Sequence, residues 1–141
     1  MFVILVGNIA TGKSTFCKNL KKNDRYIVCP DNYSGDKREI REKIINEIEY
    51  GIKNYKHVIL DAPSLTKKHR SKLLYFARNN HRTIVFDFGA GNANSLNRKI
   101  NENPELSENE WTDIHNENLR DYEEPSIDEG FDRIIKKNNS F

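Results

Sequence analysis

The sequence has few cysteines and no long apolar run. Its two cysteines, Cys17 and Cys29, fit neither a CxxC pair nor a disulfide framework, so we expect both to be free, buried thiols. No stretch approaches the roughly 18 consecutive apolar residues of a membrane-spanning helix. Since 31% of the residues are charged and 36% are hydrophobic, we expect a cytoplasmic protein that makes no contact with a membrane.

An excess of charge of one sign is also absent. The chain has 23 lysines and arginines against 21 aspartates and glutamates, which gives a formal net charge of +2. This balance excludes nucleic-acid binding that relies on overall charge, so any contact with a nucleic acid must be local. Two basic clusters are candidates for such a contact, Lys18 to Arg25 and Lys67 to Lys72.

The length and the hydrophobic pattern indicate the fold class. At 141 residues the chain has the size of one domain, and we expect residues 1–141 to form a single unit. Apolar, β-branched runs alternate with helical patterns, which predicts an α/β fold with a mainly parallel sheet covered on both faces. The predicted strands lie in "FVILV", "RYIVC", "HVILDAP", "RTIVFDF" and "GFDRIIKK". Helices are predicted to begin at Lys13 and after the capping residues Asp36, Thr66 and Ser107.

A polar, asparagine-rich stretch at approximately residues 89–106 interrupts this alternation. It reads "GAGNANSLNRKINENPEL" and has few apolar side chains to bury. We therefore expect it to form a short, mobile lid.

The segment "GNIATGKST" follows the first predicted strand directly. Gly7, Gly12, Lys13 and Ser14 satisfy the pattern G-x-x-x-x-G-K-[ST] between a strand and a helix. In such a loop, backbone N–H groups surround nucleotide phosphates, the lysine reaches the β- and γ-phosphates, and the Ser hydroxyl is a ligand of Mg²⁺. The sequence therefore predicts that ATP and Mg²⁺ bind here. The predicted nucleotide-binding residues are Gly7, Asn8, Ile9, Ala10, Thr11, Gly12, Lys13, Ser14 and Thr15.

Two aspartates are expected to face the same crevice as this loop. Asp31 follows the second predicted strand and Asp61 ends the third, and the carboxyl ends of strands in an open α/β sheet line one crevice. Asp61 is a candidate to bind Mg²⁺ through water or to orient a neighbouring side chain. Asp31 lies where an acceptor hydroxyl needs a general base.

Several of these segments together resemble a known family. "ILVGNIATGKSTF", "CPDNY" and "VILDAPSLTKKHRSKLLYFARNNHRTIVFDF" are similar to the kinase domain of 5′-hydroxyl polynucleotide kinases of bacteriophage and animals, and "YEEPSIDEGFDRIIK" is similar to the end of that domain in the animal members. The resemblance extends over most of residues 1–137. It implies a three-layer P-loop kinase fold with strand order 2-3-1-4-5, and phosphoryl transfer from ATP to the 5′-hydroxyl end of DNA or RNA.

The resemblance also implies roles for individual residues. Lys13 and Ser14 take the nucleotide and metal roles, and Asp31 corresponds to the general base. Asp61 corresponds to the carboxylate that orients the acceptor side. Arg98 matches a lid arginine that lies over the transferring phosphates.

Two positions depart from the phage pattern. Ser34 stands where an arginine contacts the phosphate of the substrate, and Glu102 stands where a second lid arginine is expected. Lys37, Arg38 and Arg41 are candidates to replace the missing contact from the next helix.

These departures leave alternatives open. One is a kinase that acts on a hydroxymethylated base in DNA or on a free nucleoside or nucleotide, which would need an aromatic pocket built from residues such as Tyr33, Tyr75 or Trp111. The other is a nucleotide-binding switch that transfers no phosphoryl group. The sequence does not indicate the oligomeric state.

Overall fold

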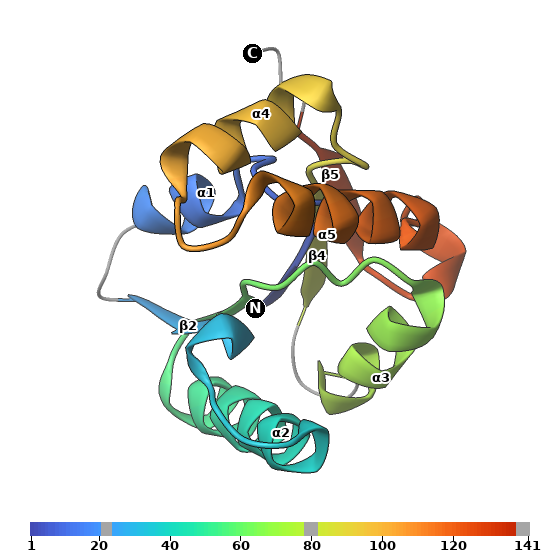
Figure 1. Cartoon of the computed structure of the whole chain (residues 1–141). Coiled ribbons are helices and arrows are strands. Elements are labelled where there is room, and N and C mark those ends of the chain that lie inside the picture. Colours follow the sequence, from blue (N-terminus) through green and yellow to red (C-terminus); the bar gives the residue numbers. More distant parts are fainter. Residues whose placement is uncertain (21–23, 78–81, 138–141) are drawn as a thin grey trace.

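Five parallel strands form one sheet at the centre of the protein (Figure 1). The computed structural model describes residues 1–20, 24–77 and 82–137. The strand order β2-β3-β1-β4-β5 and the parallel pairing of all neighbours confirm the predicted α/β fold and its predicted order. The strands are β1 (Phe2–Val6), β2 (Arg25–Val28), β3 (His57–Leu60), β4 (Thr83–Asp87) and β5 (Arg133–Lys136).

Helices follow the strands and surround the sheet. Asp36, Thr66 and Ser107 each accept a backbone N–H bond at a helix start, which confirms three predicted caps. None of the described helices combines the length and the apolar composition that crossing a bilayer requires. The α-helices are α1 (Lys13–Lys18), α2 (Lys37–Asn54), α3 (Lys67–Ala77), α4 (Ala93–Glu102) and α5 (Glu108–Asp121), and two short 3₁₀ helices are η2 (Pro30–Asn32) and η3 (Ile127–Glu129).

The larger core lies on the face of the sheet that α2 and α3 cover. Successive side chains of a strand point to opposite faces, so Phe2, Ile4 and Val6 of β1 share this face. Ile48 of α2 and Leu73 of α3 pack against them. Because β1 is buried along its whole length, its packing holds the start of the loop that follows it in one position.

The smaller core lies on the opposite face, under α1. Val3 and Leu5 of β1 pack there with Phe16 and Cys17 of α1. Burial raises the pKa of the Cys17 thiol to about 12, so this cysteine is inert at neutral pH. Cys17 is free and buried as predicted, whereas Cys29 is free but only half-buried.

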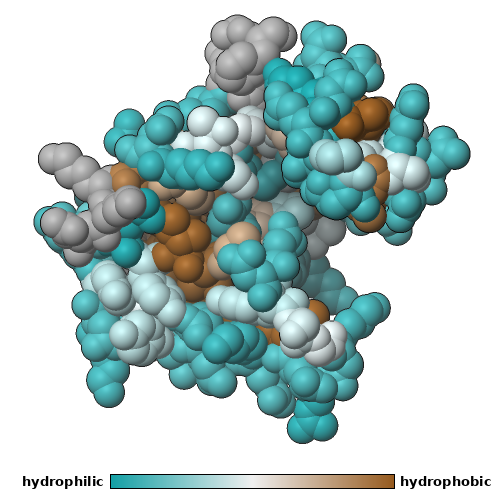
Figure 2. Space-filling view, turned by 60° about the vertical axis from the view of Figure 1, so that its left-hand side comes forward, coloured by the Kyte–Doolittle hydropathy of each residue, from teal (hydrophilic) through white to brown (hydrophobic). Residues whose placement is uncertain are grey.

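An apolar hollow of about 300 Å³ opens beside α1. Because α1 has only six residues, it leaves part of this face of the sheet open. Figure 2, which brings the left-hand side of Figure 1 forward, shows hydrophobic side chains reaching the surface on this side. The hollow is lined by Met1, Val3, Phe16, Leu20, Asp24, Arg25, His57, Ile59 and Phe86.

Helix α4 occupies most of the polar stretch for which the sequence predicts a short, mobile lid. Asn92 and Ser95 form a reciprocal capping box at its start, and Ser95 is buried. The helix forms although it is polar, because the cap satisfies its first N–H groups. The Asn92-to-Ser95 spacing is the sequence signal that could have predicted it.

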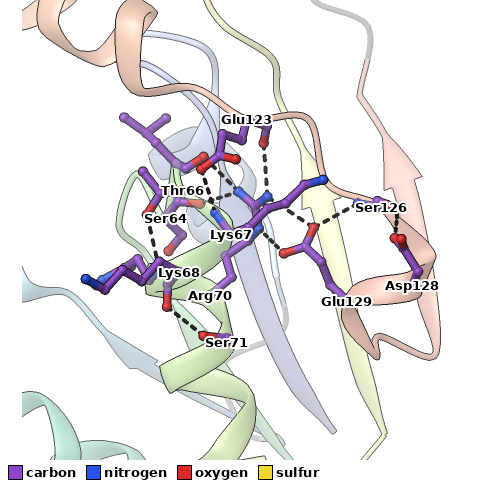
Figure 3. A network of polar contacts seen from close by, with 12 residues as sticks. Ser64, Thr66, Lys67, Lys68, Arg70, Ser71, Glu123, Ser126, Asp128 and Glu129 are labelled. Atoms are coloured by element: carbon purple, nitrogen blue, oxygen red, sulfur yellow. Dashed lines mark hydrogen bonds and ion pairs between the residues drawn. The ribbon is translucent and has the colours of Figure 1, made fainter.

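A buried arginine fastens the start of α3 to the segment that follows α5 (Figure 3). Arg70 has no exposed surface, and its guanidinium forms a bidentate ion pair with Glu129, with N–O distances of 2.9 and 3.1 Å. It also donates to the carbonyl oxygens of Ser64, Leu65 and Glu123 at 2.9 to 3.0 Å. A charge can be buried in this way because its donors find acceptors.

We predict that Arg70→Met destabilises the protein by about 3–5 kcal/mol, because it leaves the Glu129 carboxylate and three carbonyls without their donor. The exposed Lys72 lies on the same helix, so Lys72→Met is a matched control that should change the free energy of unfolding by less than about 0.5 kcal/mol. Denaturant unfolding of both variants measures the difference. Equal stabilities would contradict a structural role for the Arg70 network.

Candidate active site

The phosphate loop lies between the end of β1 and the start of α1. A Cβ on Gly7 would lie 2.8 Å from the Thr11 hydroxyl and 2.9 Å from Phe88 Cβ, so only glycine fits there. Gly12 has a φ of 105°, in the left-handed region that favours glycine. Both glycines of the predicted pattern are therefore required by the shape of the loop.

The first residues of this loop are held by the protein itself. The N–H groups of Gly7 and Asn8 donate to the carbonyls of Pro63 and Gly89, at 3.0 and 3.1 Å. The fully buried Asn8 side chain donates to the carbonyl of Ala90 at 2.8 Å and to that of His115 at 3.0 Å. Asn8 thus ties the loop to the segments on both sides of α4.

Lys13 carries a half-buried positive charge at the start of α1. Its Nζ donates to the carbonyl oxygens of Gly7 (2.8 Å) and Asn8 (2.6 Å). Burial lowers the pKa of Lys13 to about 8, although the carboxylates of Asp61 and Asp31 act in the opposite direction. The ammonium is therefore protonated at neutral pH and lies close to its titration range.

Ser14 and Asp61 lie together beside Lys13. The Ser14 hydroxyl is 3.5 Å from Oδ2 of Asp61, at the carboxyl end of β3. Burial raises the pKa of Asp61, and the Lys13 ammonium partly offsets this. Hydroxyl and carboxylate oxygens are the ligands that Mg²⁺ prefers, so the two predicted metal residues fit the ion. Among the described residues, no three His, Cys, Asp or Glu side chains gather to hold a metal by themselves.

Asp31 lies on η2, directly after β2, and is exposed. Its charge raises the pKa of both Lys13 and Asp61, so the three groups lie within electrostatic range of one another. This arrangement follows from the parallel pairing of β2, β3 and β1, which brings their carboxyl ends to one edge.

Arg98 reaches the phosphate loop from α4. Its Nη2 donates to the carbonyl oxygen of Ala10 at 2.7 Å, across 88 positions of sequence. Figure 1 shows α4 beside α1 in the same part of the molecule. The predicted lid arginine thus lies at the predicted loop.

The residues that the sequence suggests for binding the acceptor are mostly exposed. Arg38 forms an exposed ion pair with Glu42 at 3.2 Å, and Ser34 is exposed and uncharged. Arg70 is fully buried, whereas Lys67, Lys68 and Lys72 of the same basic cluster are exposed. Lys21 and Lys22 of the other basic cluster lie outside the described residues.

The aromatic side chains proposed for a base pocket have different environments. Trp111 is buried and donates its Nε1–H to the carbonyl of Asn103 at 2.8 Å, so it is a packing residue. Tyr33 is partly buried against the larger core, and Tyr75 is 69% exposed.

Comparison with known proteins finds a likeness in structure. The chain matches no protein-family model and no curated protein. Kti12 from Chaetomium thermophilum, solved in complex with ADP-AlF3, aligns with a TM-score of 0.73 and 15% identity over 99% of this chain and 90% of its own. A gluconokinase from Sinorhizobium meliloti 1021 aligns with a TM-score of 0.60 and 14% identity over 95% of this chain and 79% of its own. At these identities the likeness shows that the chain shares its α/β fold with Kti12 and the gluconokinase.

Proposed function

We propose that this protein is an ATP-dependent kinase that phosphorylates a hydroxyl group of a nucleic acid, most specifically the 5′-hydroxyl end of DNA or RNA. The observation that carries this proposal is the grouping of Lys13, Asp61 and Asp31 at one edge of the sheet, with Arg98 reaching the same loop from α4. A nucleotide-binding loop alone does not need an exposed carboxylate beside its lysine. A kinase that activates a hydroxyl does.

ATP would bind along the phosphate loop, residues 7–15. The Lys13 ammonium, which donates to two loop carbonyls in the free protein, would donate to the β- and γ-phosphates instead. Ser14 and Asp61 would hold Mg²⁺, which when bound neutralises part of the phosphate charge. Kti12, which shares the fold, was solved with ADP-AlF3, and this supports a nucleotide as the ligand.

Phosphoryl transfer then requires an oriented hydroxyl. As the bond between the acceptor oxygen and the γ-phosphorus forms, the bond from that phosphorus to the bridging β,γ-oxygen breaks and ADP leaves. The hydroxyl proton passes to the Asp31 carboxylate. Arg98 and Lys13 stabilise the charge on the transferring group, because a guanidinium and an ammonium form strong bonds with phosphate oxygens.

A polynucleotide end also has phosphates beside the reacting hydroxyl. Lys37, Arg38 and Arg41 lie in the first part of α2, directly after η2, and all three are exposed. They support a charged acceptor on the Asp31 side. The uncharged Ser34 favours the second candidate, a kinase for a free nucleoside or a modified base, because such an acceptor needs no arginine at that position.

We predict that wild-type protein transfers label from γ-labelled ATP to 5′-hydroxyl oligonucleotides in preference to nucleosides and hydroxymethylated DNA, and that Lys13→Ala abolishes the transfer.

A polynucleotide acceptor also predicts that activity falls steeply as the salt concentration rises. The double substitution Arg38→Ala and Arg41→Ala should raise the KM for the acceptor more than the KM for ATP. Equal labelling of a mononucleoside would favour the small-acceptor kinase. Hydrolysis of ATP without any labelled acceptor would favour the switch.

We predict that Asp31→Asn lowers the transfer rate about 10²–10⁴-fold with little change in ATP affinity, because the amide keeps the size of the side chain but cannot accept the proton. Asp36→Asn is a matched control, since asparagine is as good a helix cap as aspartate and α2 is retained. Initial rates and a nucleotide-binding titration separate the two effects. An Asp31→Asn protein with the wild-type rate would exclude Asp31 as the base.

We predict that nucleotide binding takes up a proton above pH 8. Phosphates favour the charged form of Lys13, so they raise its pKa from about 8, and the free protein at higher pH must bind a proton to bind ATP. Calorimetry at pH 8.5 in buffers of different ionisation enthalpy should detect the uptake, and at pH 6.5 it should be absent. In the absence of nucleotide, Lys13 keeps its proton up to pH 10.5 in the unfolded chain but only up to about pH 8 in the folded protein. The free energy of unfolding of the wild type should therefore rise relative to that of Lys13→Met between pH 8 and 10.5. Binding without proton uptake at pH 8.5 would contradict the lowered pKa.

A further inference from the structure

Lys99, the residue after Arg98, is a second cation on α4, and it contacts an aromatic ring. Nζ of Lys99 lies 4.8 Å from the centre of the Trp111 ring. The indole is fixed, because Trp111 is buried on α5 and its Nε1–H donates to the Asn103 carbonyl at the end of α4. Lys99 therefore rests on a rigid aromatic surface between the two helices.

Lys99 also lies near the phosphate loop. Trp111, on which it rests, is one helical turn before His115 of α5, whose carbonyl oxygen accepts from the Asn8 side chain of the loop at 3.0 Å. The neighbouring Arg98 bonds to the Ala10 carbonyl in the same loop. Two consecutive cations of α4 thus act on one short segment. Among the described residues, no carboxylate forms an ion pair with Lys99.

Both cations and carboxylates lie around the loop. Lys13, Arg98 and Lys99 carry three positive charges, and Asp31 and Asp61 are the carboxylates that act on Lys13. A contact with the face of an indole is weaker than a charge-assisted bond to a phosphate oxygen. An arriving phosphate would therefore draw the Lys99 ammonium away from Trp111.

We propose that Lys99 is a phosphate-binding residue of the nucleotide site, held on Trp111 until the terminal phosphate of a nucleoside triphosphate binds. The inference rests on the proposed function, because it requires the loop to bind a nucleotide. It assigns to Lys99 the charge that Glu102, which is exposed at the end of the same helix, does not supply.

The protein contains its own reporter for this movement, since Trp111 is its single tryptophan. Titration of the wild type with a non-hydrolysable ATP analogue and Mg²⁺ should change the tryptophan emission as Lys99 leaves the ring, and ADP should produce a smaller change. Lys99→Met should lose the difference between the two nucleotides. Its affinity for the ATP analogue, measured by equilibrium dialysis, should fall about tenfold or more, with little change for ADP.

Three further variants make the result interpretable. Lys99→Arg keeps the charge and should restore the preference for the triphosphate. Lys53→Met, on the exposed last turn of α2, controls for the loss of a lysine and should behave as the wild type. Lys99→Gln keeps a long polar side chain and should lose the preference as Lys99→Met does, which tests the proposal again if the methionine variant fails to fold.

Each remaining outcome overturns one proposal or both. If Lys99→Met and Lys99→Gln bind the ATP analogue as tightly as the wild type and with the same emission change, Lys99 is not a phosphate ligand, and the kinase proposal stands. Equal losses for ATP and ADP would overturn the assignment to the terminal phosphate. If the wild type binds neither nucleotide, the proposed function fails and this inference fails with it.

Discussion

The buried guanidinium of Arg70 is the interaction on which the arrangement of the site depends. Its donors connect the Ser64 and Leu65 carbonyls to Glu123 and Glu129, so they join the loop after β3 to the last part of the chain. Ser64 has a φ of 46°, a left-handed conformation that costs of order 1 kcal/mol or more for a residue other than glycine. The bond from Arg70 to the Ser64 carbonyl helps to hold this strained backbone in place.

That strained loop in turn supports the phosphate loop. Pro63, next to Ser64, accepts the N–H of Gly7, and Asp61 lies two residues earlier at the end of β3. The position of Asp61 relative to Lys13 therefore rests on contacts made by a residue outside the site. A buried ion pair is suited to this purpose because it fixes geometry, even where its net contribution to stability is small.

The charges of the site are balanced by what the proposed nucleotide would supply. Lys13 is half-buried and donates to two carbonyls, and its partial loss of solvent lowers its pKa, while Arg98 bonds to a loop carbonyl. Lys99 rests on an indole. Lys13 and Lys99 thus contact weaker partners than a phosphate oxygen, so the proposed binding of a polyphosphate would give each of them a stronger bond.

Local patterns were sufficient for much of the fold. The β1 strand, the phosphate loop and the caps Asp36, Thr66 and Ser107 were all predicted, because each depends on residues close together in sequence. The helix α4 was missed, because few apolar residues mark its inner face within a run of asparagines, whereas its capping box and its packing on α5 stabilise it in the fold.

Residues whose roles depend on distant partners could not be assigned in this way. Arg70 looks like its exposed neighbours in "KKHRSK" and differs only because Glu129, 59 positions later, meets it in the folded chain. Lys99 has no motif, and its place is set by the packing of α4 on α5 beside a loop near the other end of the chain. The sequence by itself determined the strands, the helix caps and the shape of the predicted phosphate loop, because backbone conformation and hydrophobic alternation are local. Only the tertiary structure decided which charged side chains are buried supports and which face the phosphate loop, because burial and charge pairing depend on residues that folding brings together.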